Sequence, residues 1–221
     1  MRMFPQEFWD FKDSLQNPHP AVALDTGDLQ TALNSFALYE MLDYREHGQF
    51  HSDVWVCGFG VVLWRMGDRF GAANVWSKAC DEALRGKFKY SSTGIFQSGL
   101  LLWFASVWLK DEEWHDEAVA LLDKLLKRRR LVMGANFSGL LAKLLRREID
   151  LPEIRATYDN EPAHIRVGHD WKALFYAGVR AYEDGNVEQT RQLWNQAKDP
   201  LDASLLPEYH LLRYDRNKLA R

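Results

Sequence analysis

The chain has 221 residues, of which 47% are hydrophobic and 27% charged, so it can bury a substantial core as one domain over residues 1–221. Its 28 basic and 31 acidic residues give a formal net charge of -3, which argues against a nucleic-acid-binding protein and leaves protein partners open. The most apolar run, residues 99–109, is too short to span a bilayer core of about 30 Å, so we expect no membrane attachment.

The first segment, about residues 1–26, predicts an N-terminal cap. Residues 6–16 form a short amphipathic pattern that ends at Asn17-Pro18, as a helix would. The opening residues include a proline and charged side chains rather than an uninterrupted apolar run, so they do not resemble an export signal. We therefore expect a cytoplasmic protein. A long helix follows over residues 28–46, with apolar side chains at helical spacing.

Residues 52–84 predict two apolar helices joined at Gly67-Asp68. After this turn, apolar side chains recur at intervals of three and four, which places them on one face of a helix. Gly67 ends the first helix where a left-handed residue is easiest to accommodate, and Asp68 can cap the free N–H groups of the second. Gly60 and Ala79 are small enough to let two helix backbones approach. The segment therefore predicts an antiparallel helical hairpin.

The next pair of helices has a weaker turn signal. Residues 92–110 predict an apolar helix, and its partner begins near Glu112. Acidic side chains occupy the first turns of that partner and basic ones the last, as the helix dipole favours. It ends in Arg128, Arg129 and Arg130. Such a run is commonly a solvated helix end, and its alternative is a contact with an acidic partner or a phosphate.

Residues 131–147 contain a regular amphipathic helix, and the stretch over residues 148–168 is less regular. A short helix can start at Leu151-Pro152 and run to Tyr158. The sequence Asn-Glu-Pro, ending at Pro162, breaks that helix. We expect a loop from there to Gly168.

The second clear hairpin, over residues 170–198, repeats the first. Both carry a small residue, an aromatic, a turn glycine with a capping side chain, another small residue, a tryptophan and an alanine at identical intervals. These are Gly60, Trp64, Gly67, Asp68, Ala72, Trp76 and Ala79 in the first copy, and Gly178, Tyr182, Gly185, Asn186, Thr190, Trp194 and Ala197 in the second. Such self-similarity indicates stacked hairpins, each unable to bury its apolar face alone. Hairpins would fill about residues 27–200, and a capping helix about residues 201–221.

This pattern resembles the tetratricopeptide repeat, whose units carry a glycine and an aromatic in the first helix, a glycine at the turn, then a small residue, an aromatic and an alanine. The match covers residues 52–84 and 170–200, and residues 27–39 repeat only its second half. The resemblance implies an all-α solenoid of about ten helices in stacked antiparallel hairpins, with a concave binding face and no catalytic activity.

The resemblance also implies which residues contact a partner, because in that family the first helix of each pair lines the groove. The matching positions here include Trp64, Arg65, Lys172, Phe175, Tyr182 and Glu183. Aromatic residues at helical spacing are just as often core residues, so this alternative stands for Trp64 and Tyr182. Arg128, Arg129 and Arg130 are the further partner-binding candidates.

No motif for catalysis is present: we find no nucleophile elbow, no phosphate loop and no dinucleotide fingerprint. Glu112 with His115, and Glu161 with His164, have the Glu-x-x-His spacing that di-iron bundles use. A bundle site also needs two further inward glutamates on long helices, and a proline interrupts the second pair. We therefore expect no catalytic residue, no cofactor and no metal.

Three classes of function remain. The first is a non-catalytic interaction module that binds a protein or peptide, with a second copy of the chain as one such partner. The second is a bacterial immunity protein or antitoxin that neutralises a cognate toxin, because small, slightly acidic helical proteins without catalytic motifs often have that role. The third is an all-helical enzyme or metal-binding protein.

Overall fold

Helices make up all the regular secondary structure in the part of the chain that the structure describes. The structure is a computed structural model, and it describes residues 20–47, 53–85, 92–127, 136–197 and 206–219. The predicted all-α class is confirmed, because these residues contain no strand. The helices are α2 (Pro20–Thr26), α3 (Leu29–His47), α4 (Asp53–Met66), α5 (Arg69–Leu84), α6 (Ser92–Leu109), α7 (Glu112–Lys127), α9 (Asn136–Leu145), α10 (Leu151–Tyr158), α11 (Ala163–Glu183), α12 (Val187–Gln196) and α13 (Pro207–Leu219).

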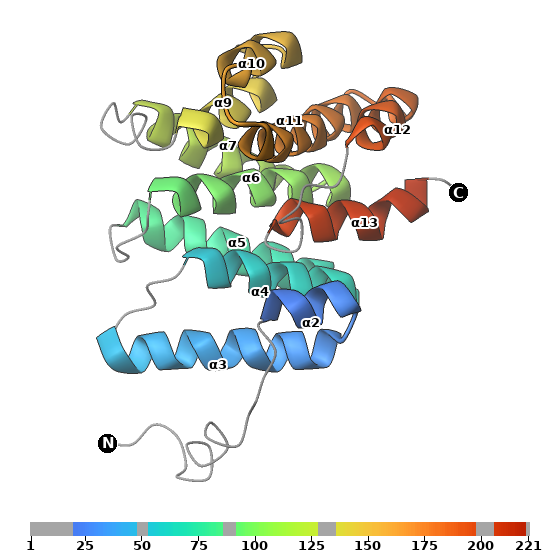
Figure 1. Ribbon diagram of the computed structural model, residues 1–221. Helices are drawn as coiled ribbons and strands as arrows, with labels where there is room; N and C mark the ends of the chain where they lie inside the picture. Colours follow the sequence, from blue (N-terminus) through green and yellow to red (C-terminus); the bar gives the residue numbers. More distant parts are fainter. Residues whose placement is uncertain (1–19, 48–52, 86–91, 128–135, 198–205, 220–221) are drawn as a thin grey trace.

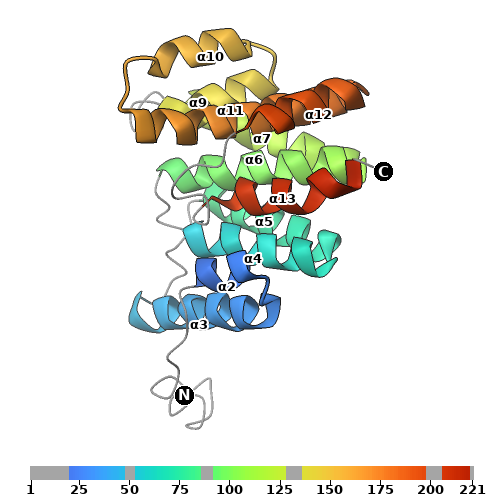
Figure 2. The same ribbon diagram turned by 45° about the vertical axis from the view of Figure 1, so that its right-hand side comes forward.

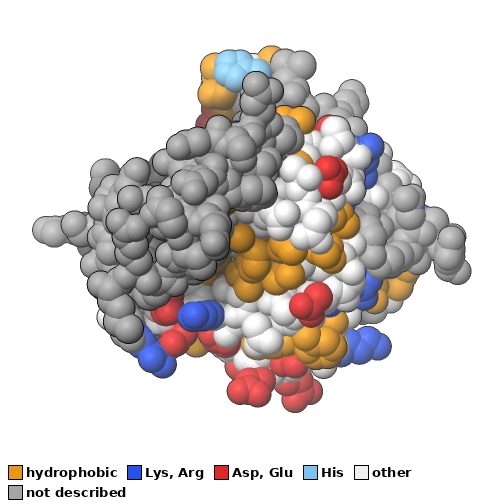
Figure 3. All heavy atoms as spheres, turned by 90° about the horizontal axis from the view of Figure 1, so that it is seen from below, with side chains coloured by type: hydrophobic (Ala, Val, Ile, Leu, Met, Phe, Trp, Pro, Cys, Tyr) orange, Lys and Arg blue, Asp and Glu red, His pale blue; other side chains and the backbone are white. Residues whose placement is uncertain are grey.

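The helices lie in layers, from α3 at one end to α10 at the other (Figure 1). Short turns join α2 to α3, α4 to α5, α6 to α7 and α11 to α12, and the two helices of each pair contact each other. These turns lie on the same side of the layers, at the right in Figure 1. At the α3 end, hydrophobic side chains gather in the middle of the described surface (Figure 3).

The turns of the two sequence-matched hairpins have the same geometry. Gly67 and Gly185 adopt left-handed φ angles of 96° and 76°, which cost glycine little. The next residue in each turn, Asp68 or Asn186, caps the following helix. Its side chain accepts a hydrogen bond from the backbone N–H three residues later, at 2.8 and 3.1 Å. The predicted turn chemistry is therefore present in both copies.

The α6–α7 turn reaches the same conformation without a glycine. Lys110 holds the left-handed position with a φ of 57°. The N–H of Asp111 donates to Ser106 O at 2.9 Å, and Asp111 Oδ1 accepts from Trp114 N at 3.0 Å. A side chain in this conformation costs about 1–2 kcal/mol, which the packing of the two helices must offset.

Each matched hairpin closes on a contact between a glycine and a tryptophan. The indole Nε1 of Trp76 and of Trp194 donates to a backbone oxygen nineteen residues earlier, at 3.4 and 3.0 Å. Gly60 and Gly178 make room for these rings, since a Cβ on either glycine would lie 2.3 or 2.0 Å from the indole nitrogen. The repeated glycine and tryptophan positions thus pack against each other within each pair.

A column of aromatic rings runs through the interior and joins neighbouring pairs. Ring centroids are 6.1 Å apart for Trp76 and Trp64, 5.0 Å for Trp64 and Phe104, 5.4 Å for Phe104 and Phe175, and 5.8 Å for Phe175 and Trp194. All five side chains are buried. Aromatic pairs of this kind add about 0.5–1.5 kcal/mol each beyond the area that they bury.

Helix α13 lies along the layers rather than beyond the last pair, where the sequence suggested an end cap. It contacts α4, α11 and α12, as Figure 2 shows. Leu211 and Leu212 are buried in these contacts, and Arg213 Nη1 lies 3.0 Å from Asp25 Oδ1 on α2. The C-terminal helix therefore bridges parts of the chain that are far apart in sequence.

The stretch before α11 differs in part from the expectation. The short helix to Tyr158 is present as α10, and Asp150 and Glu153 form a capping box at its start. The predicted loop up to Gly168 is instead the first part of α11, whose N-cap is Pro162. Proline is compatible with a helix start because the first N–H groups have no partner within the helix. The predicted helix over residues 6–16 lies outside the described residues.

Candidate functional site

The side chains of the predicted groove divide into buried and accessible ones. Trp64 and Phe175 are fully buried in the aromatic column, so a partner cannot reach them in this structure. Arg65 is half-buried and donates to the backbone oxygen of Leu24 on α2. The core alternative that the sequence left open therefore applies to Trp64. Arg128, Arg129 and Arg130 lie outside the described residues.

Lys172 belongs to the polar contact that holds α13. The fully buried carboxylate of Glu208 accepts hydrogen bonds from Gln97 Nε2 at 2.5 Å and from the Tyr176 hydroxyl at 3.1 Å. Lys172 Nζ lies 3.9 Å from this carboxylate and donates to Gln97 Oε1 at 3.3 Å. Burial, followed by the nearby Glu208 charge, raises the pKa of Tyr176. Helix α13 thus engages α6 and α11 through a network that already uses Lys172.

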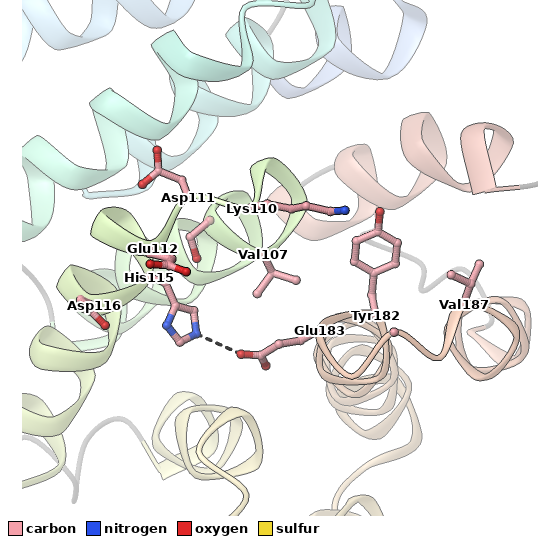
Figure 4. A pocket seen from close by; sticks show the side chains of 11 residues that line it. Val107, Lys110, Asp111, Glu112, His115, Asp116, Tyr182, Glu183 and Val187 are labelled. Carbon is pink, nitrogen blue, oxygen red and sulfur yellow. Dashed lines mark hydrogen bonds and ion pairs between the residues drawn. The ribbon is translucent and has the colours of Figure 1, made fainter.

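Tyr182 and Glu183, by contrast, line an open pocket, which we call the turn pocket. It has a volume of about 600 Å³ and lies between the α6–α7 turn and the α11–α12 turn (Figure 4). Its lining residues are Ser106, Val107, Lys110, Asp111, Glu112, His115, Asp116, Tyr182, Glu183, Gly185 and Val187. Two of the predicted partner-binding residues therefore share a cavity with residues of the α6–α7 turn.

One wall of the turn pocket is apolar. The ring of Tyr182 stacks on Trp108 with centroids 5.0 Å apart and planes 18° apart, and Trp108 stacks in turn on Trp194 at 6.2 Å. These contacts hold Tyr182 against the core. Val107 and Val187 complete this wall, and Val187 is 40% exposed.

The other wall is polar. His115 Nε2 lies 3.0 Å from Glu183 Oε1, a contact that crosses the pocket from α7 to α11 (Figure 4). The imidazole also packs edge-on against Trp103, with centroids 4.7 Å apart. The second carboxylate oxygen of Glu183, Oε2, is buried and has no hydrogen-bond partner among the described residues.

Local structure explains how the acidic side chains reach the turn pocket. Asp111 caps α7, and Glu112 and Asp116 occupy the first turns of that helix, where the dipole favours a negative charge. Glu183 is different, because it is the last residue of α11. The dipole disfavours a carboxylate there, so its position is not explained by helix stability.

The acid and histidine residues do not assemble a metal site in the described part of the chain. No group of three or more His, Cys, Asp or Glu side chains there is placed to hold a metal ion. Of the two Glu-x-x-His pairs, His115 contacts Glu183 and Glu161 contacts His169, with 2.7 Å between Glu161 Oε2 and His169 Nδ1.

A smaller cavity of about 330 Å³ lies between α9, α10 and the start of α11. His169 stacks there on Phe137 at 3.8 Å, and burial lowers the pKa of His169, which the Glu161 carboxylate opposes. The Tyr158 hydroxyl donates to Asp170 Oδ1 at 2.9 Å. These polar groups bind one another, so the cavity offers a ligand mainly apolar contacts.

Comparison of the chain with known protein families, with curated proteins and with solved structures finds no match. Among the described helices, none has both the length and the apolar character needed to cross a bilayer.

Proposed function

We propose that this protein is a non-catalytic interaction module, a tetratricopeptide-like stack of helical hairpins that binds a protein partner at the turn pocket. The observation that carries the proposal is the open cavity between two neighbouring turns, which is lined by Tyr182, Val187 and four carboxylates. Recurring turn geometry and the two glycine–tryptophan contacts support the tetratricopeptide-like arrangement.

Exposed apolar side chains on the same side of the protein support a protein partner rather than a small polar ligand. Phe70 and Met66, at the α4–α5 turn, are 63% and 46% exposed. Phe70 contacts the ring of Trp114 at 5.8 Å, and the N–H of Trp114 donates to Asp111 of the turn pocket. Exposed apolar side chains therefore lie close to the pocket, as is typical of interaction sites.

A matched pair of substitutions tests the proposal in an affinity pull-down from the native host. Val187→Asp places a charge on the apolar wall of the turn pocket, whereas Val22→Asp makes the same change on α2 at a side chain that is 50% exposed. We expect a partner, identified by mass spectrometry, to be lost with Val187→Asp and retained with Val22→Asp. Retention by both variants, with circular dichroism showing both folded, would contradict the proposal.

Neutralisation of a toxin is the second candidate function. Four carboxylates line the turn pocket against one lysine, and such a surface complements a basic active site on a partner. Co-expression with the product of the neighbouring reading frame separates this candidate from a general adaptor. Relief of growth inhibition that Val187→Asp abolishes would support it, and a neighbour without toxicity would contradict it.

A further inference from the structure

We propose that α13 is an exchangeable helix that covers a second binding surface, and that a helix of a partner protein takes its place there. The partner helix that fits carries a carboxylate in its first turn and two leucines three and four residues later, as α13 does at Glu208, Leu211 and Leu212. This inference goes beyond the proposed function, because no described residue of α13 lines the turn pocket.

The layers of helices contact one another without α13. Helix α4 contacts α6, α5 contacts α6, and α6 contacts α11. Helix α13 lies across the first helices of three pairs: it contacts α4 and α11, and its Glu208 accepts a hydrogen bond from Gln97 of α6. Figure 2 shows α13 in front of these layers. A helix seated on the faces of other helices is a common way to recognise a helical segment of a partner. Departure of α13 therefore leaves the contacts between the layers in place.

The surface under α13 provides a binding site for a carboxylate. Gln97 Nε2 and the Tyr176 hydroxyl donate to Glu208 Oε1 at 2.5 and 3.1 Å. Lys172 Nζ lies 3.9 Å from the same oxygen. These three groups belong to α6 and α11, so they remain together when α13 leaves. A carboxylate in the first turn of a helix also interacts favourably with the helix dipole. The surface therefore selects a helix with an acidic residue close to its start.

Two leucines supply the apolar part of the contact. Leu211 and Leu212 are buried, and their spacing from Glu208 places the three side chains on one face of α13. The ring of Tyr209 adds a contact with Trp171, with centroids 5.8 Å apart. The side chains that a partner helix must reproduce are therefore close together in its sequence.

The contact of α13 is weaker than its burial suggests, which favours exchange. Glu208 is fully buried, yet its second oxygen, Oε2, has no hydrogen-bond partner among the described residues. Lys172 lies beyond hydrogen-bond distance of the carboxylate, which therefore loses its hydration without a full replacement. Apolar side chains in place of the carboxylate and its partners would hold a helix more tightly. The interface is thus specific but not the most stable that the site allows, as a removable cover requires.

A labelled peptide with the sequence of residues 206–219 tests the proposal on the full chain. The double substitution Leu211→Asp and Leu212→Asp in the protein removes both leucine anchors, so α13 should no longer cover its surface. We expect the peptide to bind this variant with a Kd at least about tenfold below that for the wild-type chain, where α13 competes with it.

Changes in the peptide test its recognition pattern. Glu208→Ala should raise the Kd for the double variant about tenfold or more, because Gln97 and Tyr176 lose their acceptor. Arg213→Gln is the matched control and should change the Kd less than about fivefold, since its ion pair with Asp25 is exposed. An alanine-rich helical peptide that keeps only the glutamate and the two leucines should bind within about tenfold of the original.

Hydrogen exchange of the wild-type chain gives a readout that needs no substitution. Saturating peptide should speed the exchange of the α13 amides and leave those of α4 and α11 protected. If the double variant does not fold, as judged by circular dichroism, this measurement decides alone. Unchanged exchange of α13 overturns the proposal.

Two further results also overturn it. One is a folded double variant that does not bind the peptide, or that binds it no better than the wild-type chain does. The other is a wild-type dimer in size-exclusion chromatography that the double substitution converts to a monomer, which would assign α13 to a second copy of the chain. The turn pocket is tested separately, by Val187→Asp.

Discussion

Gly178→Ala tests the packing on which the helical pairs depend. Gly178 lies on α11, directly opposite the indole of Trp194 on α12. A Cβ added here would lie 2.0 Å from Nε1 and 2.4 Å from Cδ1 of that ring, far closer than packed atoms come. The ring must therefore move, and its hydrogen bond to Phe175 O at 3.0 Å must lengthen or break.

The magnitude follows from three opposing terms. Forcing one extra methyl group into a packed core costs about 1–3 kcal/mol. Leaving the buried indole N–H without an acceptor costs about 1–3 kcal/mol more. Replacing a glycine by alanine inside a helix returns about 0.5–1 kcal/mol. We therefore expect Gly178→Ala to lower the free energy of unfolding by about 2–4 kcal/mol.

Urea unfolding followed by circular dichroism measures this loss, and the same helix supplies the control. Gly168 is also in α11, and a Cβ there would meet no atom within 4 Å, so Gly168→Ala should stabilise the protein by about 0.5–1 kcal/mol. Gly60→Ala should match Gly178→Ala, since its Cβ would lie 2.3 Å from Trp76 Nε1. Equal midpoints for Gly178→Ala and Gly168→Ala would refute the packing argument.

Three further predictions concern the turns, α13 and an ion pair. Gly185 and Lys110 both have left-handed φ angles, of 76° and 57°, which favour glycine over any other residue. Gly185→Ala should therefore lower the free energy of unfolding by about 1–2 kcal/mol, and Lys110→Gly should raise it by a similar amount. Shifts of the same sign in the melting temperatures of the two variants would contradict this. Glu208→Ala should cost about 3–5 kcal/mol in urea unfolding, because it leaves the donors that bind this buried carboxylate unpaired; a loss below about 1 kcal/mol would mean that α13 is held in another way. The hydrogen bond from the Arg147 guanidinium lowers the pKa of Asp184 below 3.8, so its stabilisation is complete above that pH and is lost as the pH falls through the folded-state pKa. Asp184→Asn should therefore destabilise the protein at pH 7 by less than about 1 kcal/mol, since the pair is exposed, and by progressively less as the pH falls through the folded-state pKa. A deficit that does not shrink in acid would show another cause.

The turns at Gly67 and Gly185 show that a structural feature can be predicted from the sequence when neighbouring residues mark it. Gly67 and Gly185 could be assigned as helix ends because their hydrogen bonds link residues at most five positions apart. The α6–α7 turn has the same conformation, yet Lys110 gives no such signal. The same local hydrogen bond closes it, from Asp111 N to Ser106 O, but a lysine at the left-handed position does not mark the turn in the sequence as a glycine does.

The turn pocket could be predicted only in part, because it is formed by two turns that are far apart in the sequence. The family resemblance pointed to Tyr182 and Glu183, because they follow the repeat. It did not point to His115 as their neighbour, since that contact joins residues 68 positions apart. In the sequence, the acidic residues of the first turns of α7 are explained by their favourable interaction with the helix dipole. They line a cavity only because α11 lies opposite them in the folded protein.

The sequence by itself determined that the chain is helical and where two of its hairpins turn. Only the tertiary structure decided that Trp64 and Phe175 are core, that α13 lies against α4, and that an acidic pocket remains open. The physical reason is that apolar spacing shows which face of a helix must be covered, whereas what covers it depends on contacts between distant segments.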